Sequence, residues 1–512
     1  IGLDGIFEHI KGDWQFTYAP ESTWIAAGLK APGLTLQSVK IVPAMTAILS
    51  RKKIALDLKP EWHTQVNGIQ SGSLSMAETA LQLKNNVHIT VALNEGPAWN
   101  VGSSRWQWTI KKVQQQDLSI DPNPISINIE QLAGSPENLQ IKADLTCGHL
   151  ELSNKENGLA LQQIRAEFTA EGGKIAGTAS CAPQTVPGTL AIRFSHHLKN
   201  GHGQAFFTSK QPLSFSALTP LSSLLNQWPL AFDLTGGSLQ AGGSMSWRPG
   251  QPLRVILQAE LSEGKGHYQE ILFSGMEIRQ DLQLLPRVQS RKSGSVGIDT
   301  LKAGITVKNI TMETAFTPSP HGKLPQIIVR NLSASLFGGT VSDDFFSYDP
   351  QQPEVHSTIQ LNNIDLARLI TVQQVKGLKV KGRIEGSLPF FFDRNGLRMD
   401  KGELENTGKG GLIQYTLAGD NALKKSPLTG YALKALEEFH YSLLSATAQY
   451  RPDGELQVSL HLEGKSPKLD TTRPVHLNIN AEQNLLSLLK SLRYSTSLTD
   501  EIDREVQQHY QD

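Results

Sequence analysis

The chain of 512 residues has no excess of charge, few aromatic residues and no long apolar run. Its 48 basic residues are balanced by 48 acidic ones, which argues against nucleic acid as a partner, because phosphate binding needs a basic surplus on one face. No apolar run approaches the roughly 18 residues that a membrane-spanning helix needs. The chain starts at Ile1 without the basic and then apolar pattern of a signal peptide. We therefore expect a piece of a longer protein, about whose anchoring this chain says nothing.

Cysteine is almost absent as well. The two cysteines, Cys147 and Cys181, lie near adjacent predicted strands. In an oxidising compartment they would form one disulfide. Two unpaired buried thiols fit the sequence nearly as well, so both alternatives stay open.

Catalytic and metal-binding patterns are incomplete. The segment Ser293–Gly297 has serine where a nucleophile elbow needs its first glycine. His196, His197 and His202 share a loop-like segment without an acidic or cysteine partner at a useful spacing, so we interpret them as surface histidines. The pair Asp343–Asp344 has no companion acid arranged as in a glycosidase or a calcium loop. The sequence therefore predicts no enzyme, no cofactor and no metal site.

Most of the chain consists of short stretches in which apolar and polar residues alternate. Examples are Leu378–Glu385, Val458–Glu463 and Val475–Asn480. Period-two alternation places all apolar side chains on one face of a strand. Turn clusters such as Gly172-Gly173 and Arg394–Gly396 recur between these stretches and predict an antiparallel meander of hairpins. The apolar faces would either meet in closed cores or line a continuous trough in a long curved sheet.

Helical patterns are confined largely to the end of the chain. Thr429–Tyr450 carries leucine and phenylalanine at helical spacing, Ala481–Leu492 has the pattern of a second amphipathic helix, and Leu498–Tyr510 that of a charged third one. The first of these helices would either gate the end of the trough or simply cap exposed apolar residues.

Several segments carry a resemblance to a known family: Leu336–Val341, Leu361–Leu369, Gly382–Gly386, Asn395–Gly402, Gly408–Tyr415, Pro474–Asn480 and Leu485–Leu492. Over roughly residues 205–495 the chain resembles the C-terminal module of AsmA-like proteins, and it is most similar to their YdbH-like branch. The resemblance implies a mainly β protein with an elongated, partly open antiparallel sheet, curled into a taco-like groove, and a few helices mostly near the C-terminus. We divide the chain on this basis into an N-terminal part of the groove (1–204), an AsmA-like repeat region (205–428) and a C-terminal part with helices and terminal strands (429–512).

The resemblance also implies a function and partners. It implies intermembrane phospholipid transport in the periplasm of a Gram-negative bacterium, with the full-length protein anchored in the inner membrane by an N-terminal segment absent from this chain. The implied partners are phospholipids and a small outer-membrane lipoprotein of the YnbE type, which adds strands at the C-terminal end. The alternatives are a scaffold or translocation factor for outer-membrane proteins, of the TamB type, and a secreted β-sandwich binding module.

Two sets of residues follow as candidate sites. The expected lining of the lipid groove comprises Leu378, Val380, Ile384, Val458, Leu460 and Leu462. The expected edge for the partner strand comprises Val475, Leu477 and Ile479.

Overall fold

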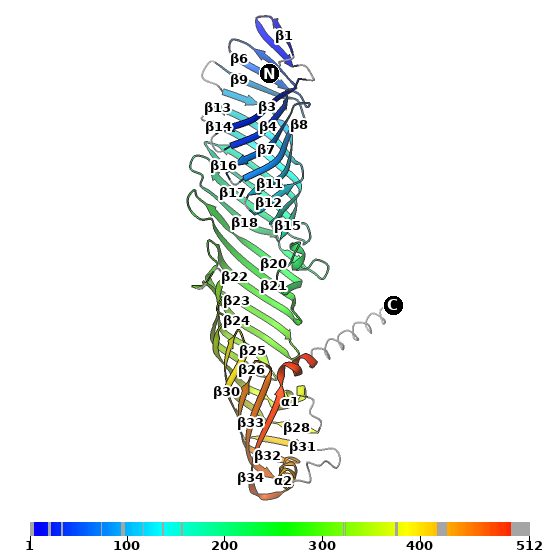
Figure 1. The fold of residues 1–512 in the computed structure, drawn as a ribbon, viewed down its shortest axis with the longest axis vertical. Helices are drawn as coiled ribbons and strands as arrows, with labels where there is room; N and C mark the ends of the chain where they lie inside the picture. The colour runs from blue at the N-terminus through cyan, green and yellow to red at the C-terminus, as the bar shows by residue number, and fades with distance from the viewer. Residues whose placement is uncertain are drawn as a thin grey trace, which may run out of the picture. The chain divides into compact units, whose positions relative to one another are not determined.

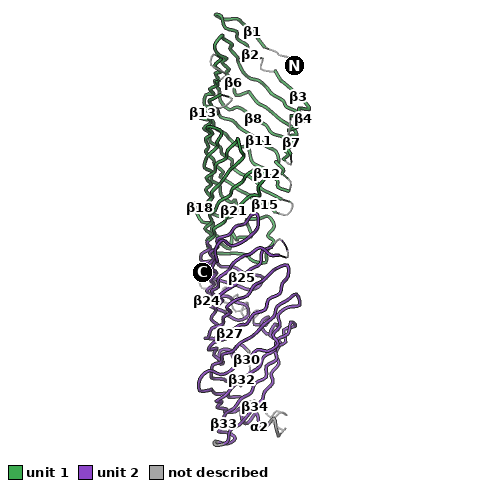
Figure 2. The backbone as a smooth tube through the Cα atoms, turned by 90° about the vertical axis from the view of Figure 1, so that its left-hand side faces the viewer, with its two compact units in different colours: residues 1–259 green, residues 260–512 purple. Residues whose placement is uncertain are grey.

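The computed structural model describes residues 5–492, apart from residues 19–21, 32–33, 73, 94–97, 116, 136–137, 155–156, 321, 323, 374–376 and 417–426 (Figure 1). The described chain is mainly β and forms two compact units, residues 1–259 and 260–512 (Figure 2). The prediction of a mainly β fold with antiparallel strands and a few helices mostly near the C-terminus is confirmed. The division into three parts at residues 204 and 428 stays a prediction.

Unit 1 contains strands β1 to β20 and one short 3-10 helix, η1. Their bounds are β1 (Gly5–Ile10), β2 (Asp13–Tyr18), β3 (Trp24–Ala31), β4 (Leu34–Val42), β5 (Met45–Leu49), β6 (Lys53–Leu58), β7 (His63–Ser71), β8 (Leu74–Leu83), β9 (Val87–Ala92), β10 (Ala98–Val101), β11 (Ser104–Gln115), β12 (Leu118–Pro122), β13 (Ile125–Ser135), β14 (Asn138–Ser153), β15 (Gly158–Glu171), β16 (Lys174–Pro183), β17 (Thr189–His197), β18 (Gly203–Gln211), β19 (Leu213–Phe215), η1 (Leu221–Leu224) and β20 (Phe232–Trp247). The boundary between the units falls inside β21 (Arg254–Tyr268).

The early strands of unit 1 form two arms that join at β13. The first arm pairs β1, β2, β5, β6, β9 and β10 in that order, and the second pairs β3, β4, β7, β8 and β11. Residues 132–134 of β13 pair with β10, whereas residues 125–129 pair with β11. Consecutive hairpins thus alternate between the arms. From β14 onward, longer antiparallel strands follow one another to β18 and β20.

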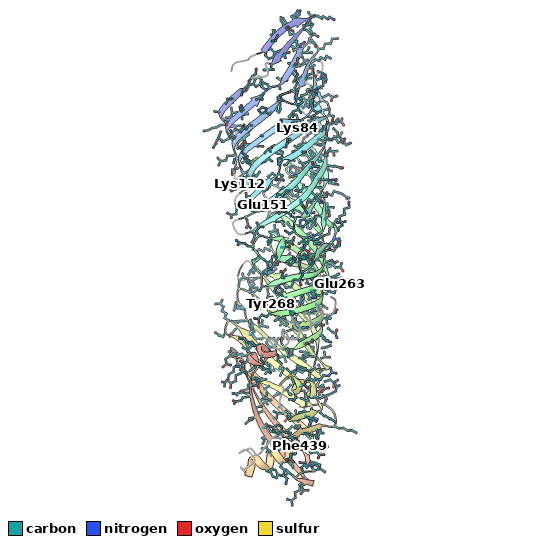
Figure 3. The ribbon with its side chains drawn as sticks, turned by 90° about the vertical axis from the view of Figure 1, so that its right-hand side faces the viewer. Lys84, Lys112, Glu151, Glu263, Tyr268 and Phe439 are labelled. Carbon is teal, nitrogen blue, oxygen red and sulfur yellow. The ribbon has the colours of Figure 1, made fainter. Side chains whose placement is uncertain are left out.

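Single residues with positive φ lie inside several strands and bend them. In unit 1 these include Gly28, Gly68, Lys112 (Figure 3) and Gln163, and in unit 2 Asn363. At Gln163 and at Asn363 the pairing register shifts, which marks a β-bulge. Bulges bend a strand and increase its twist locally, so these positions curl the sheet. Glycine and asparagine suit them because both tolerate the left-handed region.

Unit 2 continues with antiparallel strands and contains the longer helices. Its elements are β22 (Ile271–Leu285), β23 (Gln289–Lys302), β24 (Thr306–Pro318), β25 (Pro325–Leu336), β26 (Gly339–Tyr348), β27 (Val355–Asp365), α1 (Leu366–Gln373), β28 (Leu378–Lys381), β29 (Arg383–Asp393), β30 (Gly396–Asn406), β31 (Gly411–Tyr415), α2 (Pro427–Leu436), β32 (Phe439–Tyr450), β33 (Glu455–Ser466) and β34 (Asp470–Asn484). Strand β32 joins two branches, because its first residues pair with β31 and its later ones with β30. Strands β33 and β34 follow it.

The predicted helix Thr429–Tyr450 is wrong in its second half. Helix α2 ends at Leu436, and strand β32 begins at Phe439. The β32–β33 register shifts between Tyr441 and Leu443. This bulge moves the apolar alternation by one residue and thereby imitates helical spacing. The predicted helix Ala481–Leu492 is helical at residues 485–492 only, since β34 runs to Asn484. The third predicted helix lies outside the described residues.

The two cysteines are free and buried. Cys147 lies on β14 and Cys181 on β16, and β15 runs between them. Two strand spacings separate positions across an intervening strand by about 9–10 Å. A disulfide needs Cα atoms within about 7 Å, so of the two alternatives left open by the sequence the structure has the two buried thiols. Burial raises the pKa of the Cys181 thiol, which further lowers its reactivity.

Candidate functional site

One face of the unit 1 sheet carries an apolar ladder that crosses twelve strands. Each residue of this first ladder pairs with the next one on the neighbouring strand: Phe16, Ala47, Leu56, Ile89, Val101, Leu132, Ile141, Ala170, Ile175, His196, Gly203 and Trp247. The one polar ring among them, His196, accepts a hydrogen bond from Trp247 Nε1 at 3.2 Å. The ladder therefore continues from the first arm into the long strands without an unpaired polar group.

A second ladder on the same face starts from the second arm. It comprises Leu83, Trp106, Ile127, Leu145, Ala166, Ala179, Ile192, Phe207 and Gly243. The indole Nε1 of Trp106 donates to Ser104 Oγ at 3.0 Å, so its polar atom is satisfied locally. Where the arms meet, Trp62 and Trp106 contact each other edge to face, with ring centroids 5.3 Å apart. We call the face that carries both ladders the apolar face of unit 1.

Most side chains of this face are neither buried nor fully exposed. Ile141, Leu145, Phe168, Ile192 and Phe207 are all half-buried. Residues of a closed core lose nearly all contact with water, whereas these keep part of it. The apolar face of unit 1 is thus a partly open surface. The sequence alone did not decide whether the apolar faces of the strands form a closed core or a trough.

The opposite face of the same strands is polar. Asp144, Glu167, Thr178 and Arg193 follow one another across β14 to β17. Lys142 Nζ contacts Glu130 Oε2 at 2.5 Å, and this contact raises the pKa of Lys142. A shallow hollow of about 1170 Å³ lies among these strands. It mixes charges of both signs, so it offers no single-sign site for an ionic ligand.

Unit 2 carries a third apolar ladder, across eight strands. Its rungs are Ala334, Val341, Leu361, Gly386, Leu404, Ala446, Leu460 and Ile479. A Cβ atom at Gly386 would collide with the carbonyl oxygen of Glu403, so only glycine fits this rung. The third ladder leads into a buried cluster at the end of the unit.

This C-terminal cluster is closed rather than open. Its buried members are Ile364, Leu366, Ile384, Ile413, Ala435, Phe439, Tyr441, Leu444, Leu462, Val475 and Leu477. Phe439 (Figure 3), Ala435 of α2 and Leu462 have no exposed surface. Tyr441 donates its hydroxyl to the carbonyl oxygen of Lys381 at 3.0 Å, and burial raises the pKa of this phenol. Helix α2 therefore covers the apolar side chains at this end of the sheet.

The structure brings together nearly all residues predicted as site candidates. Ile384, Leu462, Val475 and Leu477 belong to the C-terminal cluster itself, and the partly buried Leu378, Val380, Leu460 and Ile479 pack against it. Val458 is half-buried and pairs with Ala448 and Ala481, further along β33. The lining role of the six groove candidates stays a prediction, and so does the edge role of Val475, Leu477 and Ile479.

The ladders of unit 1 were missed because no single segment contains them. Each strand supplies only one or two rungs, and the sequence does not say which strands pair. The alternation in Leu139–Leu145 marks Ile141 and Leu145 as sharing a face, but only the register aligns them with Ala170 and Ala166. Period-two alternation was the available signal.

Strand β34 lies at an edge of the unit 2 sheet. It pairs with β33 from Glu455–Asn484 to Ser466–Asp470, and no strand within the described residues pairs along its other side. Val475 and Leu477 point into the cluster, whereas His476, Asn478 and Asn480 are exposed. Among the described residues no helix is long and apolar enough to cross a membrane.

Comparison with known proteins gives a family and one distant relative. The family described as YdbH-like, intermembrane phospholipid transport protein YdbH, matches residues 9–507. The chain is similar to the probable phospholipid transport protein YdbH of Escherichia coli (strain K12), with 24% identity over 199 residues, which are 38% of this chain and 22% of that protein. The match thus spans about a fifth of the length of the relative. No solved structure matches.

Proposed function

The chain belongs to the YdbH-like family, and on this premise we propose that it conducts phospholipids between two membranes along its apolar face. The observation that carries the proposal is the pair of ladders in unit 1, which present half-buried aliphatic and aromatic side chains across up to twelve strands. The similar protein of Escherichia coli is itself described as a probable phospholipid transport protein.

Acyl chains suit such a surface energetically. Removing each CH2 group from water contributes about 0.8 kcal/mol, and this gain needs no specific pocket. A ladder without unpaired polar groups has no layer that would stop an acyl chain from sliding. The headgroup can stay in water at the open side, so a charged binding site is not required for transport.

We propose the periplasm of a Gram-negative bacterium as the compartment. Transport between two membranes needs an aqueous space between them, and the polar face of the sheet suits that space. In the full-length protein an anchor in the inner membrane would hold one end.

A matched pair of substitutions on β16 tests the conduit. Ala179 is a rung of the second ladder, and its neighbour Thr178 points to the polar face. Ala179→Arg should lower phospholipid transfer between donor and acceptor vesicles about tenfold or more, because an unpaired charge on the acyl path costs more than about 1.4 kcal/mol. Thr178→Arg should leave transfer unchanged.

The two variants also separate this proposal from its alternatives. Both should unfold at the temperature of the unsubstituted chain, as followed by circular dichroism. Equal transfer by Ala179→Arg and the unsubstituted chain would contradict a lipid path over this face. Absence of lipid adducts from a photo-crosslinking amino acid at Ile192 would point instead to a scaffold for outer-membrane proteins or a binding module.

We further propose that a small outer-membrane lipoprotein of the YnbE type adds a strand to the free side of β34. Unpaired backbone groups at a sheet edge invite strand addition. A photo-crosslinking amino acid at Asn480, on β34, should capture the lipoprotein in cells. The same amino acid at Thr447 should not, because Thr447 lies on the same face of β32, two strands away from that edge. Equal capture at both positions would exclude docking at this edge.

A further inference from the structure

A group of metal-ligand side chains lies on the polar face of the last two strands. His461 and Glu463 are on β33, and His476 is on β34, directly opposite Glu463. One ligand atom from each residue lies within 4.8 Å of the other two. The sequence pattern predicted no metal site, because His461 and His476 are 15 residues apart and only the register of β33 and β34 brings them together.

The distances fit a tetrahedral ion. Glu463 Oε1 lies 3.2 Å from His461 Nε2 and 3.5 Å from His476 Nδ1. Zinc binds histidine nitrogen at about 2.0–2.1 Å and carboxylate oxygen at about 2.0–2.2 Å, so neighbouring ligand atoms around a tetrahedral zinc are about 3.3 Å apart. Both histidine nitrogens therefore stand close to the required spacing from Glu463 Oε1, and the ligand atoms of the two histidines lie within 4.8 Å of each other.

Asn478 fixes the orientation of one ligand. The Nδ1 atom of His461 is 2.8 Å from Asn478 Oδ1, and the amide oxygen can only accept, so the ring donates its Nδ1 proton there. In the neutral ring this leaves the Nε2 lone pair directed toward Glu463. Metal-binding histidines typically donate their second ring nitrogen in this way, and Asn478 thus occupies the place of an outer partner.

The surroundings favour a cation and leave it accessible. A hollow of about 850 Å³ on the same face is lined by His461 and Asn478 and by three acidic residues, Glu385, Glu403 and Glu405, against one basic residue, Lys401, which pairs with Glu403. The side chains of His461 and Glu463 are each 40% exposed and that of His476 is 57% exposed, so an ion can enter with one water molecule in its fourth position.

We propose that His461 Nε2, Glu463 Oε1 and His476 Nδ1 bind one transition-metal ion, with zinc as the preferred ion. Two imidazoles and one carboxylate suit zinc better than magnesium or calcium, which prefer oxygen ligands. The bound ion would join β34 to β33 at the sheet edge. This proposal does not depend on lipid transport.

Metal titration of the purified, tag-free chain tests the site. After treatment with a chelator and dialysis, isothermal titration with Zn²⁺ should show one equivalent bound. His461→Gln and His476→Gln should each weaken binding more than about 100-fold, and Asn478→Ala about 10–100-fold, because outer partners contribute that much to metal affinity. Co²⁺ should give the intense visible absorption of a tetrahedral complex only in the unsubstituted chain and, more weakly, in Asn478→Ala.

His440→Gln is the matched control. His440 lies on β32 with its Nε2 atom 3.4 Å from Glu438 Oε1, so it is also a surface histidine beside a glutamate, but the described chain offers it no third ligand. Zinc affinity should be unchanged in this variant. The metal-free variants should all unfold at the same temperature, since the side chains are exposed. Zinc should raise that temperature in the unsubstituted chain and in His440→Gln, less in Asn478→Ala, and not in His461→Gln or His476→Gln. Equal affinity in all variants, or no saturable binding in the unsubstituted chain, would overturn the proposal.

Discussion

The middle of unit 1 and the end of unit 2 carry the same kind of apolar face, but the two faces are buried to different degrees. Ile192 and Phe207 of unit 1 are half-buried, whereas Phe439 and Leu462 of unit 2 have no exposed surface. The difference is helix α2: its Ala435 packs in the C-terminal cluster, whereas no described helix lies on the ladders around Ile192. The same alternation therefore serves as an open surface in one region and as a core in the other.

The first way to test this contrast is to place a charge in each region. Ile384→Arg should destabilise unit 2 by about 3–5 kcal/mol, because it leaves an unpaired charge at a position that is 4% exposed. Ile192→Arg should leave unit 1 folded, since the long side chain can reach water from a half-buried position. Limited proteolysis with mass spectrometry of the fragments would report each unit separately. Equal sensitivity of the two variants would contradict the contrast.

Truncation of one aromatic side chain in each region gives a smaller effect. Phe439→Ala should lower the free energy of unfolding by about 3–5 kcal/mol, the cost of emptying a closed core. Phe207→Ala should cost only about 1 kcal/mol. The side chain of Phe207 is only half-buried, so its truncation removes only part of the hydrophobic stabilisation that a fully buried ring provides. Urea unfolding followed by circular dichroism measures both. A larger loss at Phe207 would mean that the apolar face of unit 1 is covered in solution.

The bulges that curl the sheet should contribute less to the free energy of unfolding than the C-terminal cluster does. Asn363 has a φ of 58° at the bulge between β27 and β29. Asn363→Val should cost about 1–2 kcal/mol, since a β-branched residue disfavours the left-handed region. Asn363→Gly should be nearly neutral and serves as the control. If both variants unfold at the same temperature, backbone conformation at this bulge does not limit stability.

Side chains on the polar face should contribute least to the stability of the fold. Lys401 Nζ lies 2.5 Å from Glu403 Oε1, and this hydrogen bond, with the charge of Lys401, holds the pKa of Glu403 below its ordinary value. A lowered carboxyl pKa stabilises the folded chain above the ordinary pKa of about 4.3, and the gain is lost as pH falls through the lowered pKa. Both side chains are exposed, so Glu403→Gln should change the unfolding temperature only slightly at pH 7. The difference in unfolding temperature between Glu403→Gln and the unsubstituted chain should disappear as the pH falls through the lowered pKa of Glu403. A difference that persists in acid would have another cause.

Much of the fold was predictable from local pattern. The alternation in Val458–Glu463 and Val475–Asn480 predicted parts of β33 and β34, which indeed pair through Leu460–Ile479 and Leu462–Leu477. The prediction failed where a bulge interrupted the alternation, as between Tyr441 and Leu443 of β32. A helical period and a strand with one bulge place apolar residues at similar intervals, so the sequence of that segment does not distinguish them.

The candidate site was predictable as a kind of surface but not as a set of residues. Ile384 and Leu462 were predicted to line the lipid groove; the structure places both in the C-terminal cluster, and their lining role stays a prediction. Ile192 and Ala179, which lie on the partly open face, were not singled out. Exposure depends on which other segment packs over a strand, and local alternation carries no information about that.

By itself, the sequence determined that this protein is built from strands with one apolar and one polar face, because side-chain period is a local property of the backbone. Tertiary structure decided which strands pair, so that single rungs became ladders of up to twelve strands and His461 came to lie beside His476. It also decided where the apolar face stays partly open and where α2 closes it. Both outcomes depend on contacts between residues that are distant in the chain. The sequence of a short segment does not specify which distant residues it will contact or how stable those contacts are.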